Sequence, residues 1–246
     1  MATVAVIGGT GLTKLANLSI IGREVYNSRY GEPSAPLTRG TLGGTEILFL
    51  PRHGAGHTIP PHSVNYRANI SVLKDAGVDK VIAVNAVGGI TKQMAPQALV
   101  VPDQIIDYTW ARAHTFYEDA EEVVHIDFTW PYCEALRAHI QDAAKQAGLD
   151  IESKATYGAM QGPRLESAAE IDRLERDGCH IVGMTGMPEA ALAKEAGLCY
   201  ASIAVVANMA AGRGEGEITL HDIEKQLNAG MAKVRTLLET LIPQLR

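Results

Sequence analysis

The chain has 246 residues, of which 46% are hydrophobic and 20% are charged, and its formal net charge is −6. No apolar run approaches the roughly 20 residues that span a bilayer, and no basic segment precedes the apolar N-terminal stretch, so we expect a cytoplasmic protein without a membrane partner. A pI near 5.8 without a cluster of Lys and Arg disfavours a nucleic-acid partner.

Apolar runs rich in Val, Ile and Ala predict the strands. In chain order they cover residues 4–7, 81–87, 99–106 and 200–206. Runs without polar alternation are typical of strands buried on both faces, which favours a mostly parallel sheet. Two shorter runs within residues 37–51 flank Gly43-Gly44, which suits a hairpin turn because glycine adopts positive φ readily. The hairpin makes the sheet mixed.

Apolar residues at helical spacing predict the helices. The clearest lies near the C-terminus, where apolar residues from Leu220 to Leu241 recur three or four positions apart. Thr219 is its expected N-cap, with Asp222 three positions later, and Pro243 should follow its end. Further helices are expected over residues 66–76, 132–147 and 188–197. We therefore expect an α/β fold: one domain over residues 1–246, with a mixed, mostly parallel central sheet flanked by helices.

The three cysteines, Cys133, Cys179 and Cys199, are odd in number, widely spaced and set in apolar segments. This pattern suits reduced thiols in the core better than a disulfide framework or a zinc ribbon. We therefore expect free thiols and no metal held by cysteine.

Two segments at predicted strand ends carry groups suited to an anion. Residues 8–11, Gly-Gly-Thr-Gly, expose backbone N–H groups, and the Thr10 hydroxyl adds a donor, although an ordinary tight turn has the same pattern. Arg52 and His53 directly follow an apolar run. An Arg fork with an adjacent His binds phosphate well, so these two residues are the stronger signal.

A zinc site is the alternative for His53 and His57. It would need a third ligand and a helix to put both rings on one face, but Gly54 and Gly56 disfavour that helix. We therefore expect no metal.

Three further loops of small and polar residues lie at predicted strand ends, over residues 85–89, 162–166 and 183–189. Each alone suits an ordinary turn. Because the ends of such strands meet at one side of the sheet, all five loops together indicate a single binding site. Residues 212–216, with three glycines, are a candidate mobile lid.

These motifs carry a resemblance over nearly the whole chain. The segments GGTGL, RHGAGHTIPPHSVNYRAN, NAVGG, QGPRLES, GMTGMPEAALAKEAGLCYASIA and the closing IPQL resemble the trimeric family of purine nucleoside phosphorylases and 5′-methylthioadenosine phosphorylases. The resemblance implies the nucleoside phosphorylase fold and phosphorolysis, in which phosphate cleaves a purine nucleoside to free base and ribose 1-phosphate. It implies no cofactor, with inorganic phosphate as co-substrate.

The resemblance also assigns the phosphate and ribose contacts. Phosphate would be held by Thr10, Arg52, His53, the backbone of Ala86, and Thr185, and Met184 would pack on the ribose. His57 would support this site.

The base contacts implied by the resemblance favour a 6-oxopurine. Asn208 stands where methylthioadenosine phosphorylases carry Asp, and an Asn amide can donate to a 6-oxo group. Glu166, beside Leu165, stands where purine nucleoside phosphorylases carry a Glu that accepts from N1–H, and Gly183 matches their Gly. Asn208 and His53 are the expected catalytic residues.

The implied contacts to the 5′ end of the nucleoside favour a methylthio group. Leu220 and Ile223 align with the apolar 5′ pocket of methylthioadenosine phosphorylases, whereas purine nucleoside phosphorylases have a His at the Ile223 position. His125 resembles a residue that family members lend to a neighbouring subunit, which implies a homotrimer with shared sites. The two pockets together imply 5′-methylthioinosine as the preferred nucleoside.

Three alternatives remain at this point. Two keep the chemistry: a broader inosine or guanosine phosphorylase, and a methylthioadenosine phosphorylase that tolerates Asn208. The third is a nucleoside-binding regulatory protein without turnover, which the set of phosphate-binding residues disfavours because a nucleoside alone needs no phosphate site.

Overall fold

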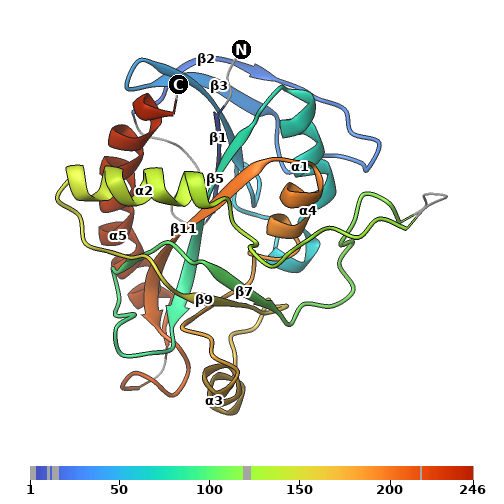
Figure 1. Ribbon diagram of the computed structural model, residues 1–246. Coiled ribbons are helices and arrows are strands. Elements are labelled where there is room, and N and C mark those ends of the chain that lie inside the picture. Colours follow the sequence, from blue (N-terminus) through green and yellow to red (C-terminus); the bar gives the residue numbers. More distant parts are fainter. Residues whose placement is uncertain (1–3, 10–11, 13–16, 119–122, 217, 246) are drawn as a thin grey trace.

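The computed structural model describes residues 4–9, 12, 17–118, 123–216 and 218–245. A large sheet runs through the molecule with helices on both sides, as Figure 1 shows, which confirms the expected α/β class. The strands are β1 (Val4–Gly8), β2 (Ser19–Glu24), β3 (Leu37–Leu42), β4 (Thr45–Pro51), β5 (Lys80–Gly89), β6 (Leu99–Val100), β7 (Gln104–Asp107), β8 (Ile151–Glu152), β9 (Thr156–Ala159), β10 (Ile181–Gly183) and β11 (Cys199–Met209). The helices are α1 (Tyr66–Asp75), α2 (Glu134–Gln146), α3 (Ala168–Arg176), α4 (Glu189–Glu195) and α5 (Leu220–Leu241), with short 3₁₀ turns at Pro61–Ser63 and Ile242–Gln244.

Helices α1, α2, α4 and α5 form two layers, one on each face of the sheet, whereas α3 packs in a smaller cluster of its own. Alternate residues of β1 and β5 enter different cores: Ala5 and Val81 join the core that contains α1 and α4. Val6 and Ile82 join the core that contains α2 and α5, on the opposite face. Burial on both faces explains why these strands are continuously apolar in sequence.

Strand β5 is the centre of the sheet, and its pairing leaves a gap. On one edge it pairs in parallel with β11. On the other edge, its first half pairs with β1 as far as Ala83, and β10 joins only at Gly88 and Gly89 in the antiparallel direction. Among the described strands, none pairs with residues 84–87 on that second edge. The sheet is therefore open along this edge of the middle of β5.

Several predicted elements are confirmed. The hairpin of β3 and β4 turns at Gly43 and Gly44, whose φ values are +57° and +76°. Helix α5 begins after Thr219, whose hydroxyl accepts a hydrogen bond from the backbone N–H of Asp222 at 3.2 Å. None of the helices in the described part of the chain is long and apolar enough to cross a membrane.

Two local predictions need correction. The expected strand over residues 99–106 is two strands, β6 and β7, separated around Pro102, which has no N–H to donate to a neighbouring strand. Helix α3 was not expected. Its signal is a capping box, in which Ser167 and Glu170 bond each other's backbone N–H groups.

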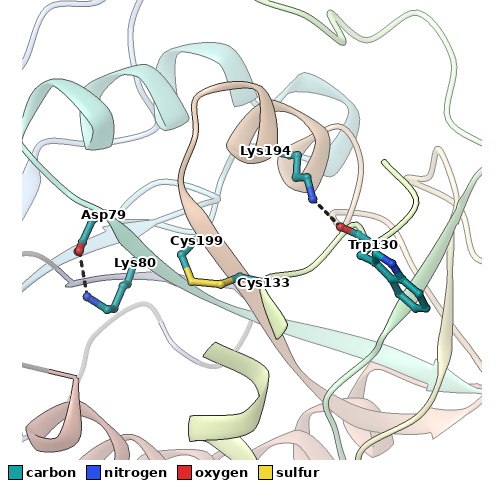
Figure 2. Close-up of a disulfide and its surroundings, with 6 residues drawn as sticks. All are labelled: Asp79, Lys80, Trp130, Cys133, Lys194 and Cys199. Carbon is teal, nitrogen blue, oxygen red and sulfur yellow. Dashed lines mark hydrogen bonds and ion pairs between the residues drawn. A yellow bond between two sulfur atoms is a disulfide. The ribbon is translucent and has the colours of Figure 1, made fainter. Parts of the chain in front are cut away.

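The prediction of reduced cysteines is wrong for two of the three. Cys133 and Cys199 form a disulfide, shown in Figure 2, whereas Cys179 is free and buried as expected. Cys133 directly precedes α2 and Cys199 begins β11, and the backbone N–H of Cys133 donates to Tyr200 O at 2.8 Å. The two segments are 66 residues apart, so their contact is invisible in the sequence.

We predict that the disulfide contributes substantially to stability. Because it closes a loop spanning 66 residues, replacing Cys133 by Ser should lower the free energy of unfolding by about 4 kcal/mol. Urea denaturation measures this change. A reductant should destabilise the native protein by a similar amount and leave the Cys133→Ser variant unaffected. Equal stability of the two proteins without reductant would contradict the prediction.

Candidate active site

A cavity of about 360 Å³ lies where the ends of β1, β4, β5, β10 and β11 meet, beside the open middle of β5. Its volume is in the range of small-molecule sites. It brings together most residues expected from the sequence: Arg52, His53, His57, Ala86, Leu165, Glu166, Gly183, Met184, Thr185, Asn208 and Ile223. The loops that follow separate strands thus form one site.

Three expected site residues stand apart from this set. Thr10 lies outside the described residues. Leu220 begins α5, but its side chain is also outside the description. His125 is exposed and does not line the cavity, so this chain alone does not bring it to the site.

Arg52 and Glu189 form a fully buried ion pair at the cavity. Nε of Arg52 donates to one carboxylate oxygen at 2.6 Å and Nη2 donates to the other at 2.8 Å. Tyr200 also donates to this carboxylate, at 2.9 Å. Burial alone would lower the pKa of the Arg52 guanidinium, but the charge of Glu189 more than offsets it, so the pKa is raised. Arg52 is therefore a permanent cation in a fixed orientation.

Arg52 keeps two N–H groups that could donate to an anion. Nη1 donates to Val84 O at 3.0 Å, which leaves one N–H on Nη1 and one on Nη2 from the five of a guanidinium. Gly9 lies against the same group, since a Cβ there would be 2.8 Å from Nη1 of Arg52 and 2.8 Å from Val84 O. A side chain at position 9 would therefore displace the guanidinium or the Val84 carbonyl.

His53 is held as a neutral imidazole. Its Nδ1 lies 2.8 Å from Ile59 O, and because a carbonyl only accepts, Nδ1 carries the hydrogen. Burial, followed by the nearby charge of Arg52, lowers the pKa of His53 to about 4. Nε2 is then the ring nitrogen that takes up a proton when a negative charge enters the cavity.

A chain of buried hydrogen bonds orients the Thr185 hydroxyl. Ser202 donates to Oδ1 of Asn85 at 2.8 Å, and Nδ2 of Asn85 donates to Oγ1 of Thr185 at 2.8 Å. Because this oxygen accepts from Asn85, its own hydrogen is available to an acceptor in the cavity. The sequence analysis placed Asn85 and Glu189 in site loops without giving their side chains a role, and it did not single out Ser202. Their signal is a polar residue within or next to an otherwise apolar run.

Two further residues of the cavity lining, Asn208 and Glu166, carry groups suited to a purine base. A bulge in β11 between Val206 and Asn208 shifts the register, and Asn208 lines the cavity beyond it. Nδ2 of Asn208 donates one hydrogen to Met209 O at 2.8 Å and retains the second. Burial raises the pKa of the Glu166 carboxyl above its usual range. The lining therefore contains both an amide donor and a carboxyl.

Gly183 leaves room for a tyrosine behind the cavity. A Cβ at position 183 would lie 2.2 Å from the Tyr157 hydroxyl. That hydroxyl accepts from the backbone N–H of Thr185 at 3.4 Å, so the absence of a side chain at 183 also supports the Thr185 loop.

The apolar part of the lining comes from two loops and from α5. Ile59, Pro60 and Pro61 lie on the segment before α1, Ile218 lies on the loop before α5, and Ile223 lies in the first turn of α5. The lining thus combines a buried cation and hydrogen-bond donors with apolar side chains.

The family model described as the phosphorylase superfamily matches residues 3–243. The chain belongs to the phosphorylase superfamily. A relative from Pseudomonas syringae pv. tomato, named probable S-methyl-5′-thioinosine phosphorylase, is 51% identical over 243 residues, which cover 98% of this chain and 99% of the relative. A 6-oxopurine nucleoside phosphorylase of Pyrococcus furiosus is 40% identical, over 99% of this chain and 93% of that protein.

Solved structures of this superfamily share the fold. A methylthioadenosine phosphorylase from Schistosoma mansoni, in complex with adenine, superposes with a TM-score of 0.94 at 32% identity. The match covers 100% of this chain and 92% of the other. The nucleoside phosphorylase fold expected from the sequence is confirmed.

We predict that phosphate raises the pKa of His53. Without an anion, this pKa is about 4, and a bound phosphate favours the imidazolium, so the midpoint should move upward and a proton should be taken up. NMR titration of the His53 ring with and without phosphate measures the shift. Sodium chloride at matched ionic strength is the control. An unchanged midpoint with phosphate bound would remove His53 from the anion site.

Proposed function

We propose that this phosphorylase cleaves 6-oxopurine nucleosides with inorganic phosphate and prefers 5′-methylthioinosine, giving hypoxanthine and 5-methylthioribose 1-phosphate. The observation that carries the proposal is one cavity in which Arg52, His53 and Thr185 face the same space as Asn208 and Glu166. A relative that is 51% identical is named for this substrate, and relatives at 40–41% identity are named for 6-oxopurine nucleosides.

The anion end supplies the nucleophile. Phosphate held by Arg52, His53 and Thr185 attacks C1′ of the ribose as the C1′–N9 bond breaks, and the bonding electron pair leaves with the purine. The ribose becomes cation-like in the transition state, and a phosphate dianion beneath it both stabilises this charge and forms the new C1′–O bond. Met184 lies beside Thr185 and packs on the ribose. No enzyme nucleophile or cofactor takes part, and phosphate is the co-substrate.

The base end stabilises the leaving group. As the glycosidic bond breaks, negative charge develops on the purine, so a donor that strengthens its bond in the transition state accelerates cleavage. The free N–H of the Asn208 amide is that donor, directed at the 6-oxo group or N7. Glu166 accepts from N1–H, which a 6-oxopurine carries and a 6-aminopurine lacks. The pair therefore selects hypoxanthine-type bases.

The apolar wall accommodates the 5′ substituent. Ile218 and Ile223 at the start of α5 offer burial to a methylthio group, at roughly 25 cal/mol per Å² of apolar surface. They offer no hydrogen bond to a 5′-hydroxyl. This contrast is the basis of the preference for 5′-methylthioinosine over inosine.

We further propose that the enzyme works as a homotrimer with shared active sites. His125 is exposed and separate from the cavity of its own chain, which fits a residue that serves a neighbouring subunit. The same segment carries exposed apolar side chains, with Trp110 66% and Val123 82% exposed. An assembly of this kind would cover them.

A phosphate-dependent cleavage assay tests the proposed function. The four nucleosides are 5′-methylthioinosine, 5′-methylthioadenosine, inosine and adenosine, each with and without phosphate. The highest kcat/KM for 5′-methylthioinosine, with no cleavage in the absence of phosphate, is the expected result. A preference for methylthioadenosine would refute the assignment of Asn208, and a preference for inosine would refute the 5′ pocket. Binding of nucleosides without cleavage would refute the proposed enzymatic activity.

Replacing Asn208 by Asp should shift the base preference toward 6-amino nucleosides. The carboxylate loses the donor to the 6-oxo group, which is worth about 1–3 kcal/mol when the partner is left unsatisfied. Parallel kinetics with methylthioinosine and methylthioadenosine measure the change. Asn208→Ala is the matched control, because it should slow both substrates without reversing their order. An unchanged ratio in the Asp variant contradicts the role of Asn208.

Replacing Ile223 by His should raise kcat/KM for inosine relative to 5′-methylthioinosine by roughly 5- to 10-fold. The imidazole gains a hydrogen bond to the 5′-hydroxyl and removes apolar surface from the methylthio group. Ile223→Val keeps the wall apolar and should leave the ratio near that of the native enzyme. If the His variant shows the native ratio, the 5′ pocket lies elsewhere.

A further inference from the structure

Arg112 is a buried cation outside the set of residues that line the cavity. It lies on the irregular segment between β7 and α2, and it is 9% exposed. Within the described part of the chain, none of the ion pairs involves Arg112. Its charge is instead solvated by backbone carbonyls.

Those carbonyls belong to two loops that border the cavity. Nη1 of Arg112 donates to Met184 O at 2.9 Å and to Met187 O at 2.5 Å. Nη2 donates to Gln161 O at 2.8 Å, and Nε donates to Oε1 of the Gln161 side chain at 3.1 Å. One guanidinium therefore bridges the loop after β9 to the loop after β10.

The position of this bridge matters because regular pairing has ended there. β9 and β10 pair in parallel up to Ala159 and Gly183, and one further backbone bond joins Met160 N to Gly183 O at 2.8 Å. Beyond that point the Arg112 side chain supplies the connection. The first loop leads to Leu165 and Glu166 at the cavity, and the second contains Met184 and Thr185.

The backbone beside Arg112 is strained in a way that serves this contact. Ala111 has a φ of +53°, a left-handed conformation that costs an L-residue with a Cβ. The turn leaves the Trp110 side chain exposed, while the Arg112 side chain is buried. The backbone N–H of Trp110 donates to the same Gln161 Oε1 at 3.2 Å. This hydrogen bond holds the conformation of Ala111 in place.

We propose that Arg112 is a positioning residue that fixes the base-binding loop relative to the loop that binds phosphate and ribose. This inference rests on the proposed function for its effect on catalysis, but not for its effect on the loops. Arg112 does not itself line the cavity. Its guanidinium sets the distance between Glu166 on one side and Thr185 on the other, which is the distance that a nucleoside and phosphate must match.

Amide hydrogen exchange tests the positioning role independently of activity. In an Arg112→Met variant, exchange over residues 160–167 and 183–188 should become at least about tenfold faster, because their local opening loses its restraint. Arg137→Met is the matched control. Arg137 is also buried, at 5% exposed, and donates to the carbonyls of Pro102 and Ser153, which do not line the cavity. Unchanged exchange in both loops of the Arg112 variant overturns the proposal.

Steady-state kinetics test the effect on catalysis. Arg112→Lys retains the charge but cannot span both loops, so kcat/KM should fall by about 100-fold, with KM rising for both the nucleoside and phosphate. Arg137→Met should keep native KM values even where it lowers stability. A loss in the Arg112 variants that only follows their loss of stability, as in the Arg137 control, overturns the proposal.

Chemical rescue provides a readout that a general loss of packing does not move. Arg112→Ala leaves a space shaped for a guanidinium, so millimolar guanidinium chloride should restore part of its activity, while sodium chloride should not. If guanidinium does not restore activity and amide hydrogen exchange in both loops keeps its native rate, the positioning role of Arg112 is overturned. If the native enzyme cleaves none of the four nucleosides but exchange still rises in the Arg112 variants, the proposed function fails and the positioning role stands.

Discussion

The buried ion pair between Arg52 and Glu189 is the interaction on which the site depends. Burying two charges costs several kcal/mol each, and the cost is offset only where the geometry is close to ideal and the other polar atoms are satisfied. Here the guanidinium and carboxylate meet at two points, and Tyr200 bonds the carboxylate as well. Glu189 also begins α4, where a helix N-terminus favours negative charge. The end of β4 and the start of α4 are thereby held together at the cavity.

The fold was largely predictable because burial on both faces leaves an unambiguous pattern. The runs that form β1, β5 and β11 are apolar, and Thr219 with Asp222 predicts the start of α5. Short strands escaped prediction because two to four residues carry too little periodicity. The gap beside residues 84–87 of β5 could not be predicted either, since it arises from how two other strands pair with the same edge.

The candidate site was predictable where chemistry-bearing residues follow a strand end, as at Arg52 and His53, whereas Asn208, which lies within β11, was expected only from the family resemblance. The partners that orient them were not. Glu189 contacts Arg52 across 137 positions of sequence, and Arg112 contacts Met184 across 72. The same limit explains the error about the cysteines, because spacing along the chain says nothing about which segments the sheet brings together.

Strand β11 is close to the end of the sequence, yet it lies in the middle of the sheet beside β5 and carries Asn208 (Figure 1). Partners so distant along the chain make the fold one of high contact order, which slows folding because long loops must close first. During synthesis, the edge of β5 that pairs with β11 stays uncovered while more than a hundred further residues are added, since Lys80 pairs with Cys199. The apolar edge of β5 is therefore exposed until β11 has been synthesised, and over that interval the nascent chain has the greatest need of a chaperone.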